Sequence, residues 1–314
     1  MITKNPSPTR LVNKFKEHAR FVIQHHFGSP PRRIVHKSAG LTNFVFAAIH
    51  KEGEFIIRIS PEAAAINSFI KEQWAQNAAR KAGVPTAEIL EVGSAIIPHP
   101  YMVTRKVVGE EATHHPNRVK IVGDMGRFAA MINAIPTTGF GETFDWSNNR
   151  LSRNETWKEY LTLEYRFESK LQLLEKSRML APEQLKKLRK LFAVAAKMKP
   201  QAALNHGDIR LKNVIADESG KITAIIDWEN CTSNMAPHWD LSLGLHDLGI
   251  DEKQHFLHGY GIKDKKLREI MPLVKAFNVT NYAAAISGIV ESGDKTRIDQ
   301  YRTRLSGALD MYSF

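Results

Sequence analysis

The sequence predicts an α+β protein in which a small β-rich part precedes a larger, mostly helical part. Residues 30–108 contain short stretches rich in Ile, Val and Phe, separated by turns that contain Gly and Pro. From about residue 117 onward, apolar residues recur mainly at helical spacing. The chain has 314 residues, of which 43% are hydrophobic, so it is long enough for one large domain or two modest ones.

The N-terminal part is predicted to be a small sheet with helices beside it. Residues 11–27 have the apolar spacing of a helix and end at Gly28, a typical helix terminator. A second helix closes at Gly83. We expect strands at 32–37, 43–49, 54–59, 87–93 and 100–108, and the second helix at 61–82.

The C-terminal part is predicted to be mostly helical. A loop rich in Gly, Asn and Ser occupies residues 139–156, and a boundary between the two parts lies near residues 108–112. We therefore expect one unit at 1–108 and a second at 109–314. Predicted helices are 117–135, 155–178, 182–197, 237–247, 251–258, 264–290 and 294–312, with strands near 213–216 and 222–227.

The formal net charge of +11 is unevenly distributed. Residues 1–110 carry 15 Lys and Arg against 8 Asp and Glu, a balance of +7, whereas residues 205–252 carry three against nine, a balance of −6. A basic first part suits a polyanion such as a nucleotide, and it equally suits a solvated surface. Charge alone leaves a polyanion-binding protein open. Because the basic residues are dispersed and match no nucleic-acid-binding motif, we expect no nucleic-acid partner.

Several features concern the compartment. Cys231 is the sole cysteine, so no disulfide can form within the chain. No apolar stretch approaches the roughly 20 residues that a membrane-spanning helix needs, and the polar N-terminus lacks the apolar core of a secretory signal. We therefore predict a cytoplasmic protein with no membrane partner; the sequence leaves the oligomeric state open.

The most informative motif is NHGDIRLKN at 205–213, followed by IIDWE at 225–229. Phosphoryl transfer to a hydroxyl group needs an acceptor for its proton, a divalent cation on the phosphates and fixed geometry. Asp208 could hold the hydroxyl group, while Asn213 and Asp227 could offer oxygen ligands to Mg²⁺, which prefers hard oxygen atoms. A turn with local side-chain hydrogen bonds is the simpler alternative. It does not explain Asp227 at the end of an Ile-rich strand.

HGDIRLKN followed by IIDWE resembles the catalytic loop and metal-binding strand of the aminoglycoside phosphotransferase and choline kinase-like family. The resemblance covers roughly residues 34–247 and is strongest at 204–229. Residues 138–142 and 156–160 are similar to hygromycin-phosphotransferase-like members in particular. The resemblance implies a protein-kinase-like fold of two lobes and an ATP-dependent, Mg²⁺-dependent small-molecule kinase.

The resemblance also implies roles for single residues of the catalytic motif. Asp208 matches the catalytic base, and Asn213 and Asp227 match the metal ligands. His206 matches a histidine that braces the loop. Arg210 stands where protein kinases have a lysine, so it is expected to contact the γ-phosphate, which the planar guanidinium group suits.

In the N-terminal part, Arg58 stands where many relatives have a phosphate-binding lysine, and Glu72 matches the acid that pairs with this cation. Arginine is a departure from the commonest pattern, although hygromycin-kinase-like sequences share it. An ordinary ion pair on the protein surface is the alternative interpretation.

Two further segments resemble nucleotide-binding elements. Ser38, Gly40 and Thr42 lie in a loop between two predicted strands that matches the nucleotide-positioning loop. The segment that includes Arg105 and Val107 looks like the hinge strand, whose backbone groups would hold the purine base.

The acceptor stays open among aminoglycosides, amino alcohols, sugars and amino acids. Glu229 is the candidate acceptor-binding residue, and Asp240 is expected to cap or brace a helix start. A catalytically silent nucleotide-binding module of the same fold is the alternative function, and a polyanion-binding protein is a more distant one. Further carboxylates that could form an acceptor wall, or sit on solvated helix faces, are Glu142, Asp145, Glu155, Glu159 and Glu164.

Overall fold

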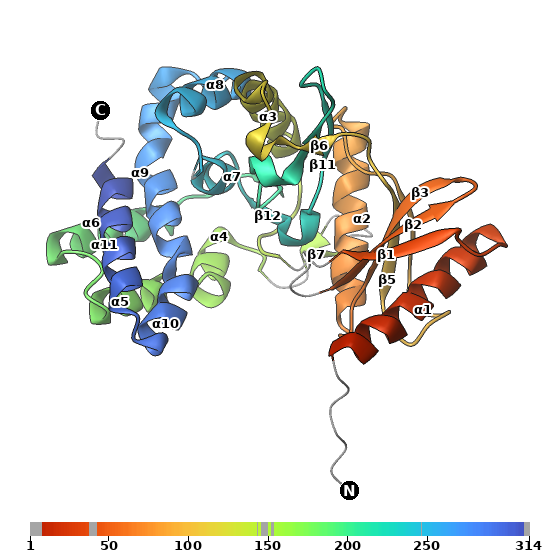
Figure 1. Ribbon diagram of the computed structural model, residues 1–314. Coiled ribbons are helices and arrows are strands. Elements are labelled where there is room, and N and C mark those ends of the chain that lie inside the picture. The colour runs from red at the N-terminus through yellow and green to blue at the C-terminus, as the bar shows by residue number, and fades with distance from the viewer. Residues whose placement is uncertain are drawn as a thin grey trace, which may run out of the picture.

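The computed structural model describes residues 8–37, 43–142, 144–145, 150–151, 154–245 and 247–310. A sheet flanked by two helices forms the lobe on the right of Figure 1, and a larger, mostly helical lobe lies on the left. The α+β fold class with a small β-rich N-terminal lobe is therefore confirmed. Among the described residues, no helix is both long and apolar enough to cross a membrane.

The N-terminal lobe is built on an antiparallel sheet of five strands in the order β1-β2-β3-β5-β4. Along β3, Phe55, Ile57 and Ile59 are buried and pack in one core with residues of α1. Because side chains alternate along a strand, Arg58 points to the opposite face, toward α2. The elements are α1 (Pro8–Phe27), β1 (Arg33–Lys37), β2 (Phe44–His50), β3 (Gly53–Ile59), α2 (Ala65–Lys81), β4 (Ile89–Gly93) and β5 (Tyr101–Arg105).

Short strands of the helical lobe flank the motif residues along the chain. The hairpin of β10 (Val214–Ala216) and β11 (Ile222–Ile225) extends onto β6 (Glu110–Glu111), just past the predicted boundary between the lobes. A second pair joins β9 (Ala202–Asn205) to β12 (Thr232–Met235). The two strand pairs therefore flank the segment that connects them, residues 206–213.

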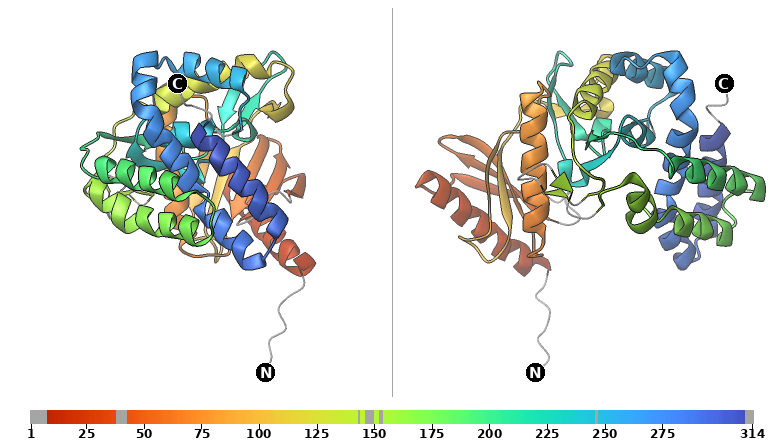
Figure 2. Two further views of the ribbon diagram at one scale, coloured as in Figure 1. Left: turned by 90° about the vertical axis from the view of Figure 1, so that its left-hand side faces the viewer. Right: turned by 180° about the vertical axis from the view of Figure 1, so that it is seen from behind.

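Helices form the rest of this lobe around two apolar cores. Figure 2 shows from two sides that α3 and α8 lie side by side at one end, whereas α5, α6, α9, α10 and α11 gather at the other. A Cβ atom on Gly126 would lie 2.0 Å from the Phe256 carbonyl oxygen, so the close contact of α3 and α8 needs glycine there. The bounds are α3 (Arg118–Asn133), α4 (Trp157–Glu159), α5 (Phe167–Lys176), α6 (Pro182–Ala195), α7 (His238–Gly244), α8 (Ile250–Tyr260), α9 (Asp264–Asn281), α10 (Ala283–Ser292) and α11 (Lys295–Asp310).

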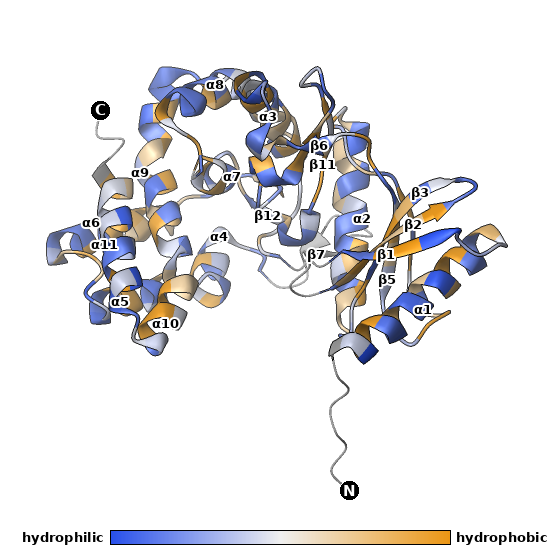
Figure 3. Cartoon of the chain, viewed as in Figure 1, coloured by the Kyte–Doolittle hydropathy of each residue, from blue (hydrophilic) through white to orange (hydrophobic). Residues whose placement is uncertain are grey.

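Figure 3 shows how polarity follows these elements: α1 alternates between hydrophilic and hydrophobic residues along its length, as a helix covering one face of a sheet requires. Two of the predicted helices differ from the structure. The helix expected at 155–178 is interrupted by a π-helical turn at Tyr160–Glu164 and by Arg166 in the left-handed region. The helix expected at 264–290 breaks at Tyr282.

The strands β9 and β12 are among those that were not predicted. All four residues of β12 are buried although three are polar, because their side chains find hydrogen-bond partners inside the lobe. The Asn234 amide donates to the Tyr160 hydroxyl group at 2.9 Å, and the Ser233 hydroxyl group donates to the Gly139 carbonyl at 2.7 Å. Such a strand shows no alternation of apolar and polar residues, the signal that sequence patterns provide.

Candidate active site

The backbone of the predicted catalytic loop is held by one buried carboxylate. Asp240 of α7 accepts hydrogen bonds from the N–H groups of His206 at 3.0 Å and Gly207 at 2.9 Å, and from the Asn133 amide at 2.8 Å. Burial raises the pKa of Asp240, and these hydrogen bonds oppose that rise. The residue thus has a structural role, but it braces the catalytic loop rather than the start of its own helix.

Gly207 is required by the path of this loop. Its φ is +78°, a region that side chains disfavour, and an added Cβ atom would lie 2.0 Å from the Asn230 carbonyl oxygen. The backbone at residue 207 therefore packs directly against the segment that follows Asp227.

His206 connects the catalytic loop to the strand that ends before Asp227. Its Nε2 lies 3.1 Å from the Ile226 carbonyl oxygen, and its Nδ1 lies 3.2 Å from the Asp208 backbone nitrogen. A carbonyl oxygen only accepts and a backbone N–H only donates, so Nε2 carries the proton and the ring is neutral. Burial lowers the pKa of His206 to about 4, which agrees with the neutral form. The structure thus places the brace where the sequence predicted it.

The Asp208 carboxylate is surrounded by donors. Arg210 Nε donates to Oδ1, while Lys212 Nζ and Asn213 Nδ2 each lie 2.9 Å from Oδ2. Arg210 also pairs with Asp247 at 3.3 Å. Burial raises the pKa of Asp208, but the hydrogen bonds from Arg210 and Lys212 outweigh it, so the pKa is lowered. Asp208 is therefore ionised at neutral pH.

The structure pairs Arg210 with Asp208, and its predicted contact with the γ-phosphate stays a prediction. The structure adds a second cation that sequence reasoning missed. Lys212 stands four residues after Asp208 in the same motif, and that spacing was the available signal. Both cations border the position at which a phosphoryl group would approach Asp208.

Asn213 and Asp227, the predicted metal ligands, are brought together by the backbone. The Ile226 N–H donates to the Asn213 carbonyl at 2.9 Å, which sets Asp227 beside Asn213. The Asn213 amide nitrogen donates to the carbonyl and the carboxylate of Asp208 at 2.8 and 2.9 Å. Because these contacts use the nitrogen, the amide oxygen is the atom left for a cation.

The backbone at Asp227 is unusual. Its φ of 65° lies in the left-handed region, which costs a non-glycine residue of order 1–3 kcal/mol and often marks a functional site. Among the residues that the structure describes, none donates a hydrogen bond to its carboxylate. One carboxylate and one amide oxygen suit Mg²⁺, which takes its other ligands from phosphates and water. Over the same described residues, no cluster of three or more His, Cys, Asp or Glu forms a metal site by itself.

Arg58 and Glu72 form a buried pair with two hydrogen bonds, of 2.7 and 3.2 Å. Their side chains are 17% and 1% exposed, so this is not the surface ion pair that the sequence also allowed. Burial lowers the pKa of Arg58, but the interaction with Glu72 outweighs it and the pKa is raised. A fixed guanidinium group at this position suits a phosphate.

Glu229 lies against this pair, because its carboxylate is 3.6 Å from Arg58. Burial and the nearby Asp227 carboxylate raise the pKa of Glu229. Lys71 of α2 donates to the Glu229 carbonyl at 2.9 Å and thereby links the two lobes. Glu229 therefore stands beside the predicted phosphate-binding cation; its role toward an acceptor stays a prediction.

The predicted purine-binding strand ends earlier than expected. It stops at Arg105 rather than residue 108, and the Arg105 side chain pairs with Glu88 at 2.9 Å. The next residue, Lys106, donates its backbone N–H to Glu54 at 2.9 Å, so the ladder to β3 continues one residue past the strand. Val107 follows directly. The predicted loop residues Ser38, Gly40 and Thr42 lie outside the described residues.

A hollow of about 170 Å³ opens beside Asp208, and neither Arg58 nor Glu72 lines it. It lies between α7, α9 and the catalytic loop, and polar uncharged side chains make up much of its wall. Its lining residues are Asp208, Arg210, Ser242, Leu243, Asn278, Asn281 and Tyr282.

The carboxylates proposed from sequence as an acceptor wall do not line this hollow. Glu164 accepts hydrogen bonds from the Glu142 backbone N–H at 3.0 Å and the Asn154 amide at 2.6 Å. Glu159 closes a capping box at the start of α4. Both carboxylates thus stabilise the local backbone, and the side chain of Asp145 lies outside the described residues.

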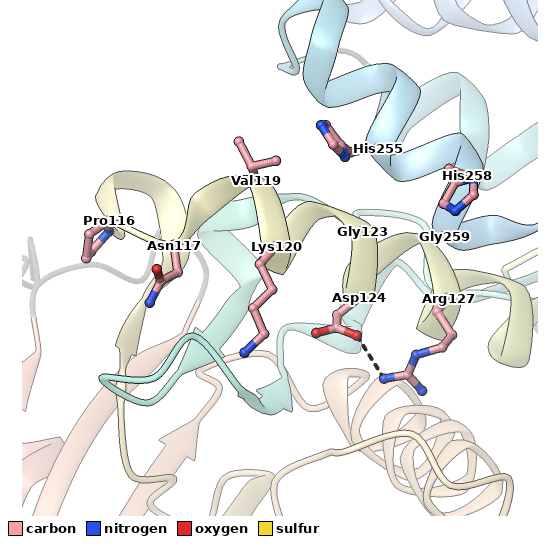
Figure 4. A pocket seen from close by; sticks show the side chains of 10 residues that line it. All are labelled: Pro116, Asn117, Val119, Lys120, Gly123, Asp124, Arg127, His255, His258 and Gly259. Atoms are coloured by element: carbon pink, nitrogen blue, oxygen red, sulfur yellow. Dashed lines mark hydrogen bonds and ion pairs between the residues drawn. The ribbon is translucent and has the colours of Figure 1, made fainter.

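A larger hollow, of about 730 Å³, lies on the outer surface between α3 and α8 (Figure 4). Its cations already have partners: Arg127 pairs with Asp124 at 3.1 Å, and Lys120 donates to the Ser219 carbonyl at 3.1 Å. None of the motif residues lines it. Asp208 and Arg210 instead line the smaller hollow.

A phosphotransferase site needs a proton acceptor, oxygen ligands for a metal and cations for the phosphates, and the residue types gathered around Asp208 are ones that could supply them. The sequence matches the model of the phosphotransferase enzyme family over residues 35–273. This is more than half of the chain, and the protein belongs to that family. It is an enzyme, a small-molecule kinase, as the sequence predicted.

Solved structures share its fold. Aminoglycoside phosphotransferase APH(4)-Ia superposes with a TM-score of 0.67 at 16% sequence identity, covering 98% of this chain and 100% of that one. A ternary complex of a thermostable mutant of this enzyme with AMP-PNP and hygromycin B gives 0.66 at 16% identity, with 94% and 98% covered. The GDP and kanamycin complex of APH(2")-IIia gives 0.60 at 16% identity, with 95% and 100% covered. No curated protein sequence matches the chain.

Proposed function

We propose that the protein transfers the γ-phosphoryl group of ATP to a hydroxyl group of a small molecule, with Mg²⁺ as cofactor and Asp208 as catalytic base. The observation that carries this proposal is the hydrogen-bonded unit of Asp208, Asn213 and the segment between β11 and Asp227, which His206 holds together. It supplies a proton acceptor and two metal ligands from a segment of about 20 residues.

The N-terminal lobe, residues 1–108, would bind the nucleotide, and residues 109–314 would hold the metal and the acceptor. Arg58, oriented by Glu72, would contact phosphate oxygens, and the backbone near Arg105 and Val107 would hold the purine base. Ser38, Gly40 and Thr42 would approach the phosphates. Solved relatives of the same fold bind AMP-PNP or GDP, which supports a purine nucleotide as donor and leaves ATP and GTP as alternatives.

The chemistry follows from the charges at Asp208. The acceptor hydroxyl group would donate a hydrogen bond to the ionised carboxylate, which orients its oxygen toward the γ-phosphorus. As the new P–O bond forms and the bond to the ADP oxygen breaks, the proton would pass to Asp208. Arg210 and Lys212 would turn toward the charge on the transferred phosphoryl oxygens. Mg²⁺ held by Asn213 and Asp227 would neutralise negative charge on the phosphates.

The test is ADP release by the purified protein with Mg-ATP and Mg-GTP, in the presence of aminoglycosides, amino alcohols, sugars and amino acids. We expect ADP or GDP release with one acceptor class, together with a mass increase of that acceptor by one phosphoryl group. Binding of Mg-nucleotide without any release would instead support a silent nucleotide-binding module. Salt-sensitive binding of nucleic acid without nucleotide binding would support a polyanion-binding protein.

The single cysteine bears on the cellular compartment of the protein. Cys231 is buried, and burial raises the pKa of its thiol to about 12, so it behaves as a packing residue. With no other cysteine in the chain, we propose a cytoplasmic location.

A further inference from the structure

Lys71 of α2 is a buried lysine that reaches across the boundary between the lobes. The residue is only 6% exposed, and its Nζ donates a hydrogen bond of 2.9 Å to the Glu229 carbonyl of the other lobe. Burying a long cationic side chain costs hydration and rotamer freedom. A methionine would fill the same space without removing a charge from water, so what the lysine adds at this position is its hydrogen bond.

The carbonyl that Lys71 holds belongs to a 3₁₀ turn, Trp228–Asn230, which directly follows Asp227. Within this turn the Cys231 N–H donates to the Trp228 carbonyl at 2.9 Å. The chain then leaves the helical path for β12, and the Glu229 carbonyl takes a donor from Lys71. Lysine is a common donor to carbonyl groups at the end of a helix.

The same turn also packs against the catalytic loop. The Trp228 indole donates to the Ile225 carbonyl at 2.9 Å, and its ring centroid lies 4.6 Å from that of His206. The Asn230 carbonyl oxygen lies so close to Gly207 that a Cβ atom there would come within 2.0 Å of it. The turn is therefore held by α2 as well as by the catalytic loop.

The backbone of Asp227 lies between two of these fixed points. On its N-terminal side, the Ile226 N–H donates to the Asn213 carbonyl at 2.9 Å. On its C-terminal side, Lys71 holds the Glu229 carbonyl. Asp227 itself has a φ of 65°, and a non-glycine residue keeps such a conformation only where its surroundings fix it. The contact from Lys71 is thus part of what determines where the Asp227 carboxylate points.

The neighbouring residue of α2 acts on the other half of the proposed site. Glu72 accepts two hydrogen bonds from Arg58, of 2.7 and 3.2 Å, and Arg58 also lies 3.6 Å from the Glu229 carboxylate. Figure 1 shows α2 on the side of the N-terminal lobe that faces the helical lobe. Two consecutive residues of one helix therefore hold the proposed phosphate-binding cation and the turn after the proposed metal ligand.

We propose that Lys71 is a positioning residue for the metal site. Through the Glu229 carbonyl it keeps the Asp227 carboxylate oriented for Mg²⁺, so the affinity for Mg²⁺ depends on the contact between α2 and the helical lobe. Lys71 acts through the backbone and contacts neither the nucleotide nor the metal. This inference rests on the proposed function, because it concerns the metal ligand Asp227 of that same site.

The test is the Mg²⁺ dependence of nucleotide binding in Lys71→Met, which keeps the length of the side chain and removes the donor. Calorimetry measures the affinity for AMP-PNP, or GMP-PNP where GTP is the donor, in EDTA and over a range of Mg²⁺ concentrations. We expect the affinity in EDTA to stay within about twofold of the wild type. The Mg²⁺ concentration that gives half of the tightening should increase roughly 10-fold, the lower end of the range for residues that orient metal ligands.

Two further variants show whether the effect belongs to Lys71. The matched control is Lys81→Met, which removes an exposed cation from the last turn of α2 and should change neither quantity. Glu72→Gln should weaken nucleotide binding by a similar factor in EDTA and in Mg²⁺, because Glu72 acts on Arg58. Different patterns from two adjacent residues distinguish positioning of the metal ligand from a general loosening of α2.

Urea denaturation of each variant separates positioning from stability. A purely structural brace would lower the stability of Lys71→Met and leave its Mg²⁺ dependence like that of the wild type, and this result would overturn the inference. An equal loss of affinity in EDTA and in Mg²⁺ would also overturn it, since Lys71 would then act on nucleotide binding itself.

Lys71→Gln, a shorter and neutral side chain, is the second variant and replaces Lys71→Met if that protein does not fold. It should shift the Mg²⁺ dependence in the same direction, and an unchanged dependence would again overturn the inference. Nucleotide binding by the wild type that does not depend on Mg²⁺ would instead contradict the proposed function itself.

Discussion

The donor half and the acceptor half of this active site are built in different ways. On the donor side, residues 206–229 hold one another: His206 bonds to Ile226, Asn213 bonds to Asp208, and the buried Asp240 fixes the loop backbone. On the proposed acceptor side, two hollows of about 170 and 250 Å³ are lined by residues of α7, α8, α9 and α11, which are spread over about 70 residues of the chain.

This difference follows from the chemistry that each half performs. A phosphoryl transfer needs the same proton acceptor and metal ligands whatever the acceptor is, so a short, self-bonded segment can supply them. Recognition of one acceptor depends on the shape and charge of a groove, which loops and helix faces can change without disturbing the donor side. The predictions below test whether the two halves are separable in this way.

The largest effect is expected from Asp208→Asn. The amide keeps the size of the side chain but removes the proton acceptor, so kcat should fall by roughly 10²–10⁴-fold. Mg-nucleotide binding should stay within about twofold, because Asp208 belongs to the transfer step. ADP release and calorimetric binding of nucleotide measure the two quantities. Asp251→Asn, an exposed acid at the start of α8, is the matched control and should leave both unchanged.

Asp240→Ala should act through stability instead. The change leaves two backbone N–H groups and the Asn133 amide without their acceptor inside the protein, at a cost of roughly 3 kcal/mol or more in the free energy of unfolding. Urea denaturation measures this loss. Asp264→Ala, at the exposed start of α9, should cost less than about 1 kcal/mol. Equal losses in the two variants would contradict the bracing role.

Asp227→Ala should weaken binding of Mg-nucleotide by roughly 10–100-fold, the value of one charge-assisted contact. Affinity for nucleotide measured in EDTA should change little, because the carboxylate acts through the metal. The protein should also be no less stable. Among the described residues, none donates a hydrogen bond to this carboxylate, and the alanine substitution removes none of the contacts within the loop. A matching loss of affinity with and without Mg²⁺ would contradict the assignment of Asp227 as a metal ligand.

The last expected effect concerns pH. Burial lowers the pKa of both His206 and His238 to about 4, whereas an unfolded chain has a histidine pKa of about 6.5. Because the unfolded state binds protons first, stability is complete above pH 6.5 and falls as the pH decreases toward 4. At pH 5 each histidine should cost roughly 2 kcal/mol.

Urea denaturation at pH 7.5 and pH 5 measures this difference, and His238→Gln tests its origin. His238 lies in α7 outside the catalytic motif, so the variant should lose about half of the pH dependence. An unfolding free energy that is the same at both pH values would show that the two histidines are not held neutral.

The sequence predicted which residues of the proposed donor half lie together, because the information that brings them together is local. Asp208, Asn213 and Asp227 lie within about 20 residues, and their spacing alone brings them together once two short strands pair. Arg58 and Glu72 were also predictable, since a strand followed by a helix places alternate residues of the strand toward it. The low exposure of that pair could not be predicted, because it depends on how the segment around Glu229 packs against α2.

The proposed acceptor half could not be predicted, because the residues that line it are far apart in the sequence. Nothing in the sequence near Arg304 indicates that α11 returns to α9 and α7, and the acids of the loop after α3 looked as suitable as any other wall. The packing of the helices determines which residues line the hollows. The Glu164 carboxylate accepts a hydrogen bond from the Asn154 amide, whereas Lys275 and Arg304 line the hollow of about 250 Å³. The break at Tyr282, which the continuous apolar pattern concealed, lets α10 and α11 fold back.

The most direct test of the donor half is thermal stabilisation by nucleotide, measured with Mg²⁺ and with EDTA for the wild type, Asp208→Asn and Asp227→Ala. We predict a clear increase in Tm with Mg-nucleotide that EDTA reduces, that Asp208→Asn retains and that Asp227→Ala loses. An increase in Tm that is the same in all three proteins, or that does not depend on Mg²⁺, would contradict a kinase site built on Asp208, Asn213 and Asp227.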